Sequence, residues 1–158
     1  MLFRSLGVIV EPATDNDRQD ILAVTSRIDT FTEEEKETVG ELWEERATGY
    51  HFLVAREDGQ LIGYACYGTH PLTEGTYDLF WIAVDPSVRR RGAGRALLRE
   101  TESDVRARGG RLILVETSGS DEYAATRSFY ESVGYEKEAV IRDFYKAGDD
   151  LVFYTRHL

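Results

Sequence analysis

The sequence predicts an α/β fold (α+β in some schemes), with a mixed, mostly antiparallel sheet of seven strands, a central parallel β-α-β crossover and about four flanking helices. Three observations support this prediction. Short segments rich in apolar residues have the length and alternation of strands. Longer segments carry apolar residues at helical spacing behind capping residues. One apolar strand also leads through a glycine-bearing loop into a helix and then a further strand. No repeat or linker interrupts this order, so we expect a single domain over 1–158.

The first half of the chain is predicted to hold two helices and a hairpin. Thr14 can cap a first helix, and Thr32 with Glu35 forms a capping box for a second. The pair Asp58-Gly59 is typical of a two-residue hairpin turn between antiparallel strands. In chain order, the expected elements are a strand at 7–11, helices at 15–28 and 32–46, and strands at 50–57 and 60–68.

The second half is predicted to centre on the crossover, which should be right-handed and parallel. Gly109 and Gly110 stop its helix, and Gly134 ends the helix that follows. A turn at 147–150 joins two final strands. The expected elements are a strand at 76–84, a helix at 92–108, a strand at 111–117, a helix at 122–133, and strands at 136–145 and 151–156.

The loop that opens the crossover helix predicts an anion site. It carries Arg89, Arg90 and Arg91, followed by Gly92 and Gly94. Backbone N–H groups at a helix N-terminus lack intrahelical partners and bind anions, and glycines let a pyrophosphate approach closely. The alternative is a solvated arginine patch beside ordinary turn glycines. A P-loop is excluded because no Gly-Lys-Ser/Thr follows, and a dinucleotide fold is disfavoured by the late position of the loop.

Composition excludes several other classes. The net charge of −10 argues against nucleic-acid binding, and no apolar run approaches a membrane span or the pattern of a signal peptide. Cys66 is the only cysteine, which excludes an intramolecular disulfide and fits a cytoplasmic location. The three histidines have no ligand-like spacing with Cys66, so we expect no metal.

Two segments resemble the GNAT superfamily of acyl-CoA-dependent N-acetyltransferases. The segment from Arg89 to Gly94, after Val84-Asp85-Pro86, matches its signature of arginine or glutamine, two residues, glycine, one residue, and glycine or alanine. The segment Phe129-Tyr130 through Gly134-Tyr135 matches its later helix. The resemblance covers nearly the whole chain. It implies a single GNAT-like domain over 1–158 that transfers an acetyl group from acetyl-CoA to a primary amine, of a small molecule or a peptide, by direct attack.

The resemblance also implies how acetyl-CoA is held. Its pantetheine arm would pair with the strand like an added strand, its pyrophosphate would sit on the loop, and the Val84 N–H would stabilise the oxyanion. The residues implied in acetyl-CoA binding are Ile82, Ala83, Val84, Arg89, Arg90, Arg91, Gly92, Ala93, Gly94 and Arg95.

Three residues are implied in catalysis. Tyr130 matches the position of the general acid that protonates the leaving thiolate. Glu116 is the first candidate for the base that deprotonates the amine, and Asp78 is the second. Glu116 as an ordinary exposed strand carboxylate remains an open alternative. An acyl-cysteine on Cys66 is disfavoured because Cys66 lies in the middle of a predicted strand, between Ala65 and Tyr67, with no evident histidine partner, and a packed thiol is the expected role.

Tyr145 and Trp81 are the candidate contacts for the acceptor amine. Proteins of this family often pair through late strands, so a homodimer is a further expectation. The competing function is a non-catalytic acyl-CoA-binding or sensing module. Release of CoA that depends on an acceptor would distinguish the two, because only an enzyme produces it.

Overall fold

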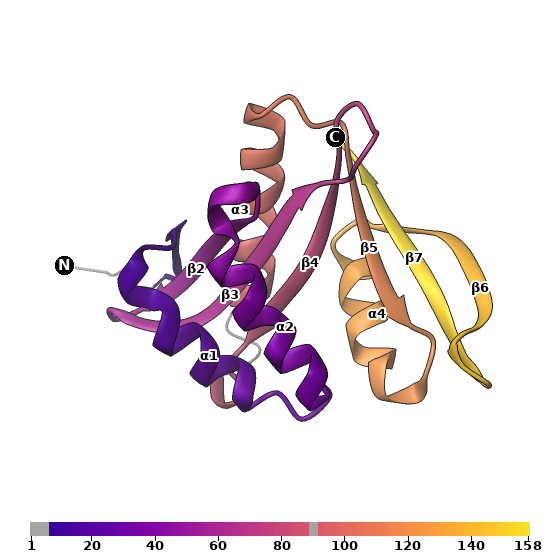
Figure 1. Cartoon of the computed structure of the whole chain (residues 1–158), viewed down its shortest axis with the longest axis horizontal. Helices are drawn as coiled ribbons and strands as arrows, with labels where there is room; N and C mark the ends of the chain where they lie inside the picture. Colours follow the sequence, from indigo (N-terminus) through magenta and orange to yellow (C-terminus); the bar gives the residue numbers. More distant parts are fainter. Residues whose placement is uncertain (1–6, 89–91) are drawn as a thin grey trace.

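The computed structural model describes residues 7–88 and 92–158, which form one mixed sheet with helices on both faces (Figure 1). The strand order is β1-β2-β3-β4-β5-β7-β6, and only β4 and β5 pair in parallel. The predicted fold class is therefore confirmed. The strands are β1 Ile9–Pro12, β2 His51–Glu57, β3 Gln60–Thr69, β4 Thr76–Val84, β5 Leu112–Ser118, β6 Glu136–Lys146 and β7 Asp149–His157. The α-helices are α1 Arg18–Ser26, α2 Glu33–Glu44, α3 Ala93–Ala107 and α4 Ala124–Ser132.

The predicted element bounds differ from the structure mainly at helix starts and in the last hairpin. The helices predicted to begin at Asp15 and Glu122 instead open with the short 3-10 helices Asp15–Asp17 and Asp121–Tyr123. The last turn is also shorter than predicted, because β6 extends to Lys146 and β7 already begins at Asp149. Cross-strand pairing of Lys146 with Asp149 extends the ladder into residues that look like turn residues in the sequence.

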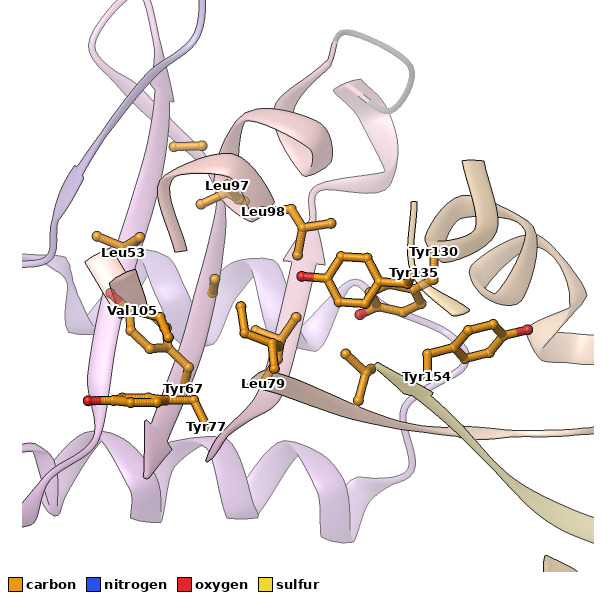
Figure 2. Close-up of a cluster of buried hydrophobic side chains, with 14 of the residues drawn as sticks. Leu53, Tyr67, Tyr77, Leu79, Leu97, Leu98, Val105, Tyr130, Tyr135 and Tyr154 are labelled. Carbon is orange, nitrogen blue, oxygen red and sulfur yellow. The ribbon is translucent and has the colours of Figure 1, made fainter. Parts of the chain in front are cut away.

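Two apolar layers enclose the sheet. Helices α1 and α2 cover one face of β2 to β4, with Ile21, Val24 and Trp43 at their contact. Helices α3 and α4 cover the other face, where Leu97, Val105 and Tyr130 belong to one buried cluster (Figure 2). None of the helices in the described part of the chain has the length and apolar character needed to cross a membrane.

We expect Leu97→Ala to lower the free energy of unfolding by about 2–5 kcal/mol, because it empties a fully buried position. Urea denaturation followed by circular dichroism measures the change. The matched control is Leu72→Ala, since Leu72 is fully exposed in the β3–β4 loop and its loss should change stability by no more than about 0.5 kcal/mol. Equal midpoints for the two variants would contradict this account of the core.

Candidate active site

The parallel strands β4 and β5 pair at one end and part at the other (Figure 1). Their register joins Thr76 to Leu112 and ends where Asp78 meets Leu114, although β4 continues to Val84. From Leu79 to Val84, the backbone groups on the β5 side of β4 have no pairing partner on β5. Backbone polar groups demand hydrogen bonds, so this free edge is suited to bind an extended chain.

A bulge in β4 lies next to the parting. Cys66 pairs with Trp81 while Tyr67 pairs with Leu79, which leaves Phe80 without a partner on β3. A bulge shifts the alternation of side chains, and here Phe80 and Trp81 both pack on the α1–α2 face. Trp81 also makes an edge contact with Phe31, at 6.3 Å between ring centroids.

The strand residues predicted to contact acetyl-CoA lie along this free edge. Ile82 and Val84 are partly buried against the α3–α4 cluster, and Ala83 is buried on the opposite face. Their side chains are thus taken up by packing on the two faces, and their backbone is the part available to a ligand.

Helix α3 begins where the predicted anion site lies. Gly92 caps it in the left-handed region at φ +82°, a conformation that glycine adopts without strain. Ala93 is buried, and a Cβ on Gly94 would lie 3.4 Å from the Phe129 ring. Arg95 is exposed. The predicted contacts Arg89, Arg90 and Arg91 lie outside the described residues.

Asp85 anchors the start of this loop. Its carboxylate accepts hydrogen bonds from the Ser87 N–H at 3.0 Å and the Ser87 hydroxyl at 2.8 Å, and it pairs with Arg27 at 2.5 Å. Burial alone raises the pKa of Asp85, but these hydrogen bonds and the Arg27 charge outweigh it and hold the pKa below its ordinary value. The ion pair between Arg27 and Asp85 thereby connects the C-terminal end of α1 to the loop that leads into α3.

Glu116 and Asp78 lie together on the face of the sheet opposite α3 and α4. Asp78 pairs in register with Leu114, and Glu116 follows two residues later on the same side of β5. Glu116 is exposed as a residue, yet its carboxyl group is partly desolvated. This burial raises the pKa of Glu116 above its ordinary value, the charge of Asp78 raises it further, and His70 partly offsets both.

A long bulge in β6 brings Tyr145 close to Glu116. Between the pairs Ile141–Leu151 and Lys146–Asp149, residues 142–145 have no register partner in the β6–β7 ladder. Asp143 holds the bulge in a left-handed conformation, with its N–H donating to Asp150 at 3.0 Å and its carboxylate accepting from the Gly148 N–H at 2.8 Å. Burial first, and then the nearby charges of Glu116 and Asp149, raise the pKa of Tyr145 to about 12.

Tyr130 lies on the other face, on α4. Its side chain is only 3% exposed and its ring contacts Phe129, Tyr135 and Tyr154, the last two of which are seen beside it in Figure 2. Burial raises the pKa of Tyr130, so the hydroxyl keeps its proton at neutral pH. No residue in 7–88 or 92–158 hydrogen-bonds this hydroxyl. The structure therefore places Tyr130 and Glu116 on opposite faces of the sheet.

Sequence reasoning missed three residues that shape this region. His70 contacts Asp78, with 2.8 Å between Nδ1 and Oδ2. Arg127 on α4 donates to the carbonyls of Ser118 and Ser120, both at 2.7 Å, and so ties the end of β5 to the helix that carries Tyr130. The Tyr123 hydroxyl donates to the carbonyl of Thr30 at 3.1 Å. These contacts cross between elements distant in sequence, and no local motif marks them.

A mixed sheet with a parallel β4-α3-β5 crossover and a glycine-capped helix is the GNAT-like arrangement expected from the sequence. The chain belongs to the acetyltransferase (GNAT) family, whose model matches residues 19–135. This match confirms the predicted family.

A solved structure from Desulfovibrio desulfuricans, assigned to the GNAT family, is 46% identical with a TM-score of 0.91 and covers 96% of this chain and 99% of its own. The N-alpha-acetyltransferase RimI of Mycobacterium tuberculosis is 37% identical over 99 residues, which are 61% of this chain and 58% of the relative. The chain spans about half the length of the curated relatives it matches. YncA from Salmonella typhimurium, solved with its cofactor acetyl-CoA, shares the fold at 20% identity and a TM-score of 0.77, covering 96% of this chain and 94% of its own.

Proposed function

We propose that the protein transfers an acetyl group from acetyl-CoA to a primary amine by direct attack. The observation that carries the proposal is the parting of β4 and β5 between a partly desolvated carboxylate, Glu116, and a buried tyrosine, Tyr130. The similarity to RimI and to the ribosomal protein bS18-alanine N-acetyltransferase of Escherichia coli favours the α-amine of a peptide as the first acceptor to test, ahead of a small-molecule amine.

The fit of acetyl-CoA rests on two features of this chain. The unpaired edge of β4 offers backbone hydrogen bonds to an extended pantetheine arm along Ile82, Ala83 and Val84. The first turn of α3, from Gly92 to Arg95, offers N–H groups and the positive end of the helix dipole to a pyrophosphate. Arg89, Arg90 and Arg91 would add charge-assisted hydrogen bonds to the same phosphates.

On the acceptor face, Glu116 would take a proton from the ammonium form of the acceptor. The lone pair of the nitrogen could then attack the thioester carbon. The Val84 N–H would stabilise the negative oxygen that develops there. Tyr130 would give its proton to the leaving sulfur as the carbon–sulfur bond breaks, and the second proton that the nitrogen loses as the amide forms would restore the Tyr130 hydroxyl. Asp78 is the weaker candidate for the base because its carboxylate already pairs with His70. Tyr145 and Trp81 would contact the acceptor.

The test is release of CoA thiol from acetyl-CoA across a panel of amines: polyamines, aminoglycosides, amino acids and peptides with varied N-termini. Thiol release that requires one class of amine, with the acetylated amine found by mass spectrometry, supports the proposal and names the acceptor class. Binding of acetyl-CoA with no release across the panel favours the acyl-CoA-binding module. The cytoplasmic location, the homodimer, the single domain and the absence of a metal remain predictions.

We expect Gly92→Ala to weaken acetyl-CoA binding by about 3- to 10-fold, because a left-handed alanine costs about 1 kcal/mol or more and displaces the N–H groups that face the phosphates. Isothermal titration calorimetry measures the dissociation constant. Gly59→Ala is the matched control, since Gly59 has a φ of +79° in the β2–β3 turn and equally open surroundings. Equal affinities in the two variants would contradict the assignment of this helix start to the cofactor.

A further inference from the structure

His70 is fixed at the closed end of the parted strands. It follows β3 directly, its N–H donates to the Thr76 carbonyl at 2.8 Å, and its own carbonyl accepts from the Thr73 hydroxyl at 2.8 Å. The backbone of His70 is therefore held on both sides by the β3–β4 hairpin. The position of its ring relative to β4 is then set by one further contact.

That contact is with Asp78. The distance from His70 Nδ1 to Asp78 Oδ2 is 2.8 Å. A carboxylate can only accept, so Nδ1 carries the hydrogen, and in the neutral imidazole Nε2 then keeps its lone pair. Within the described ranges, Nε2 makes no hydrogen bond. The His70 side chain is 43% exposed and that of Asp78 only 13%, so the imidazole extends from a shielded carboxylate to solvent.

Glu116 is the neighbour of this pair. Asp78 and Leu114 are register partners, and Glu116 lies one pleat further along β5 on the same face, about 7 Å away along the strand direction. The charge of Asp78 raises the pKa of Glu116, and the charge of a protonated His70 lowers it. The three side chains thus form one electrostatically coupled group on the acceptor face.

The proposed reaction requires an exit for protons. An amine arrives mostly as an ammonium ion, because lysine-type amines have a pKa of about 10.4 and α-amines of about 8. Conversion of an ammonium and a thioester to an amide and a thiol releases one proton for each turnover. A proton accepted by Glu116 must leave before the next turnover, and Glu116 faces the negative charge of Asp78 on the adjacent strand.

We propose that His70, oriented by Asp78, carries this proton from Glu116 to solvent. Nε2 accepts the proton that Glu116 releases, carried by the water that fills the space between them, Asp78 stabilises the imidazolium through Nδ1–H, and the exposed ring returns the proton to bulk water. Only N–H and O–H bonds change in this step. The inference rests on the proposed function, because it assigns a second proton-transfer residue to the same site.

Charged residues lie on the strands and in the loop that adjoin His70. Asp78 lies on β4 and Glu116 on β5. Glu74 shares the hairpin loop with His70, and Arg111, just before β5, donates from Nε to the Glu74 carbonyl at 2.8 Å. The kinetics of a His70 variant are therefore compared with those of the unaltered protein at the same pH and ionic strength, so that the charges of Glu74 and Arg111 affect both proteins equally.

The test substitutes His70→Gln, which keeps a hydrogen-bond donor for Asp78 but cannot carry a proton. We expect kcat to fall about 10-fold with the KM values unchanged, less than the ~10²-fold that loss of a directly acting acid or base costs. Added imidazole buffer should restore part of the loss. His157→Gln, an exposed position at the end of β7, is the control and should match the unaltered protein. Unchanged kcat, or a loss that imidazole does not restore, would overturn the proposal.

A second measurement does not depend on activity. Nitrogen-15 NMR of histidine-labelled protein should show His70 with the hydrogen on Nδ1, and Asp78→Asn should shift the population toward Nε2–H. A hydrogen on Nε2 in the unaltered protein would overturn the role of His70. If no amine is acetylated by the unaltered protein, the proposed function fails; if acetylation is normal and His70→Gln matches it, only this inference fails.

Discussion

Glu116→Gln should lower kcat/KM for the amine by about 10²- to 10⁴-fold, with acetyl-CoA affinity unchanged, because the amide keeps the shape of the carboxylate and cannot accept a proton. Steady-state thiol release gives the rate, and calorimetry gives the affinity. Glu136→Gln at the exposed start of β6 is the matched control and should leave both unchanged.

The pH dependence of kcat/KM tests the same role of Glu116. The base acts only when deprotonated, so activity is lost as the pH falls through the pKa of Glu116. Partial burial and the charge of Asp78 raise that pKa above its ordinary value of 4.5, which moves the acid limb of kcat/KM to higher pH than an exposed glutamate would give. The Gln variant should lose this limb. If the limb persists in Glu116→Gln and disappears in Asp78→Asn, the base is Asp78.

Tyr130→Phe should lower kcat by about 10²-fold with little effect on acetyl-CoA affinity, because it removes the proton offered to the leaving thiolate. Burial raises the pKa of Tyr130, so the hydroxyl remains protonated at neutral pH and its contribution is lost only at strongly alkaline pH. Thiol-release kinetics at saturating acetyl-CoA measure the change.

The control for this second prediction is Tyr154→Phe. Tyr154 stacks on Tyr130 with 6.0 Å between ring centroids, and its hydroxyl bonds to Glu131 instead of facing the parted strands. This variant removes a hydroxyl from the same cluster and should leave kcat unchanged. An unchanged kcat in Tyr130→Phe, or equal losses in the two variants, would contradict the role of Tyr130 as general acid.

Several local features could be predicted because neighbouring residues determine them. The capping box before α2 forms as expected, with Glu35 N–H donating to Thr32 at 3.1 Å and Thr32 N–H donating to Glu35 at 2.8 Å. Strand β4 has the predicted bounds, and Gly92 is the N-cap of α3, which begins at Ala93, one residue after the predicted start. The family could be predicted for a similar reason, since its signatures lie within short segments whose residue types meet local backbone and anion-binding needs.

The arrangement of the candidate site depends on contacts between distant segments. Register between strands determines the end of β4–β5 pairing at Asp78, the bulge at Phe80 and the bulge that carries Tyr145. The contact between His70 and Asp78 depends on the course of the hairpin that joins them.

The sequence by itself thus determined the element order, the family and the residue types available for chemistry. Only the tertiary structure decided that Glu116 and Tyr130 lie on opposite faces of the sheet and that His70 contacts the carboxylate beside Glu116. The physical reason is the distance along the chain over which each interaction acts. Capping, turn formation and side-chain alternation act over a few residues, whereas strand register and the parting of β4 from β5 depend on how the helices pack against the whole sheet.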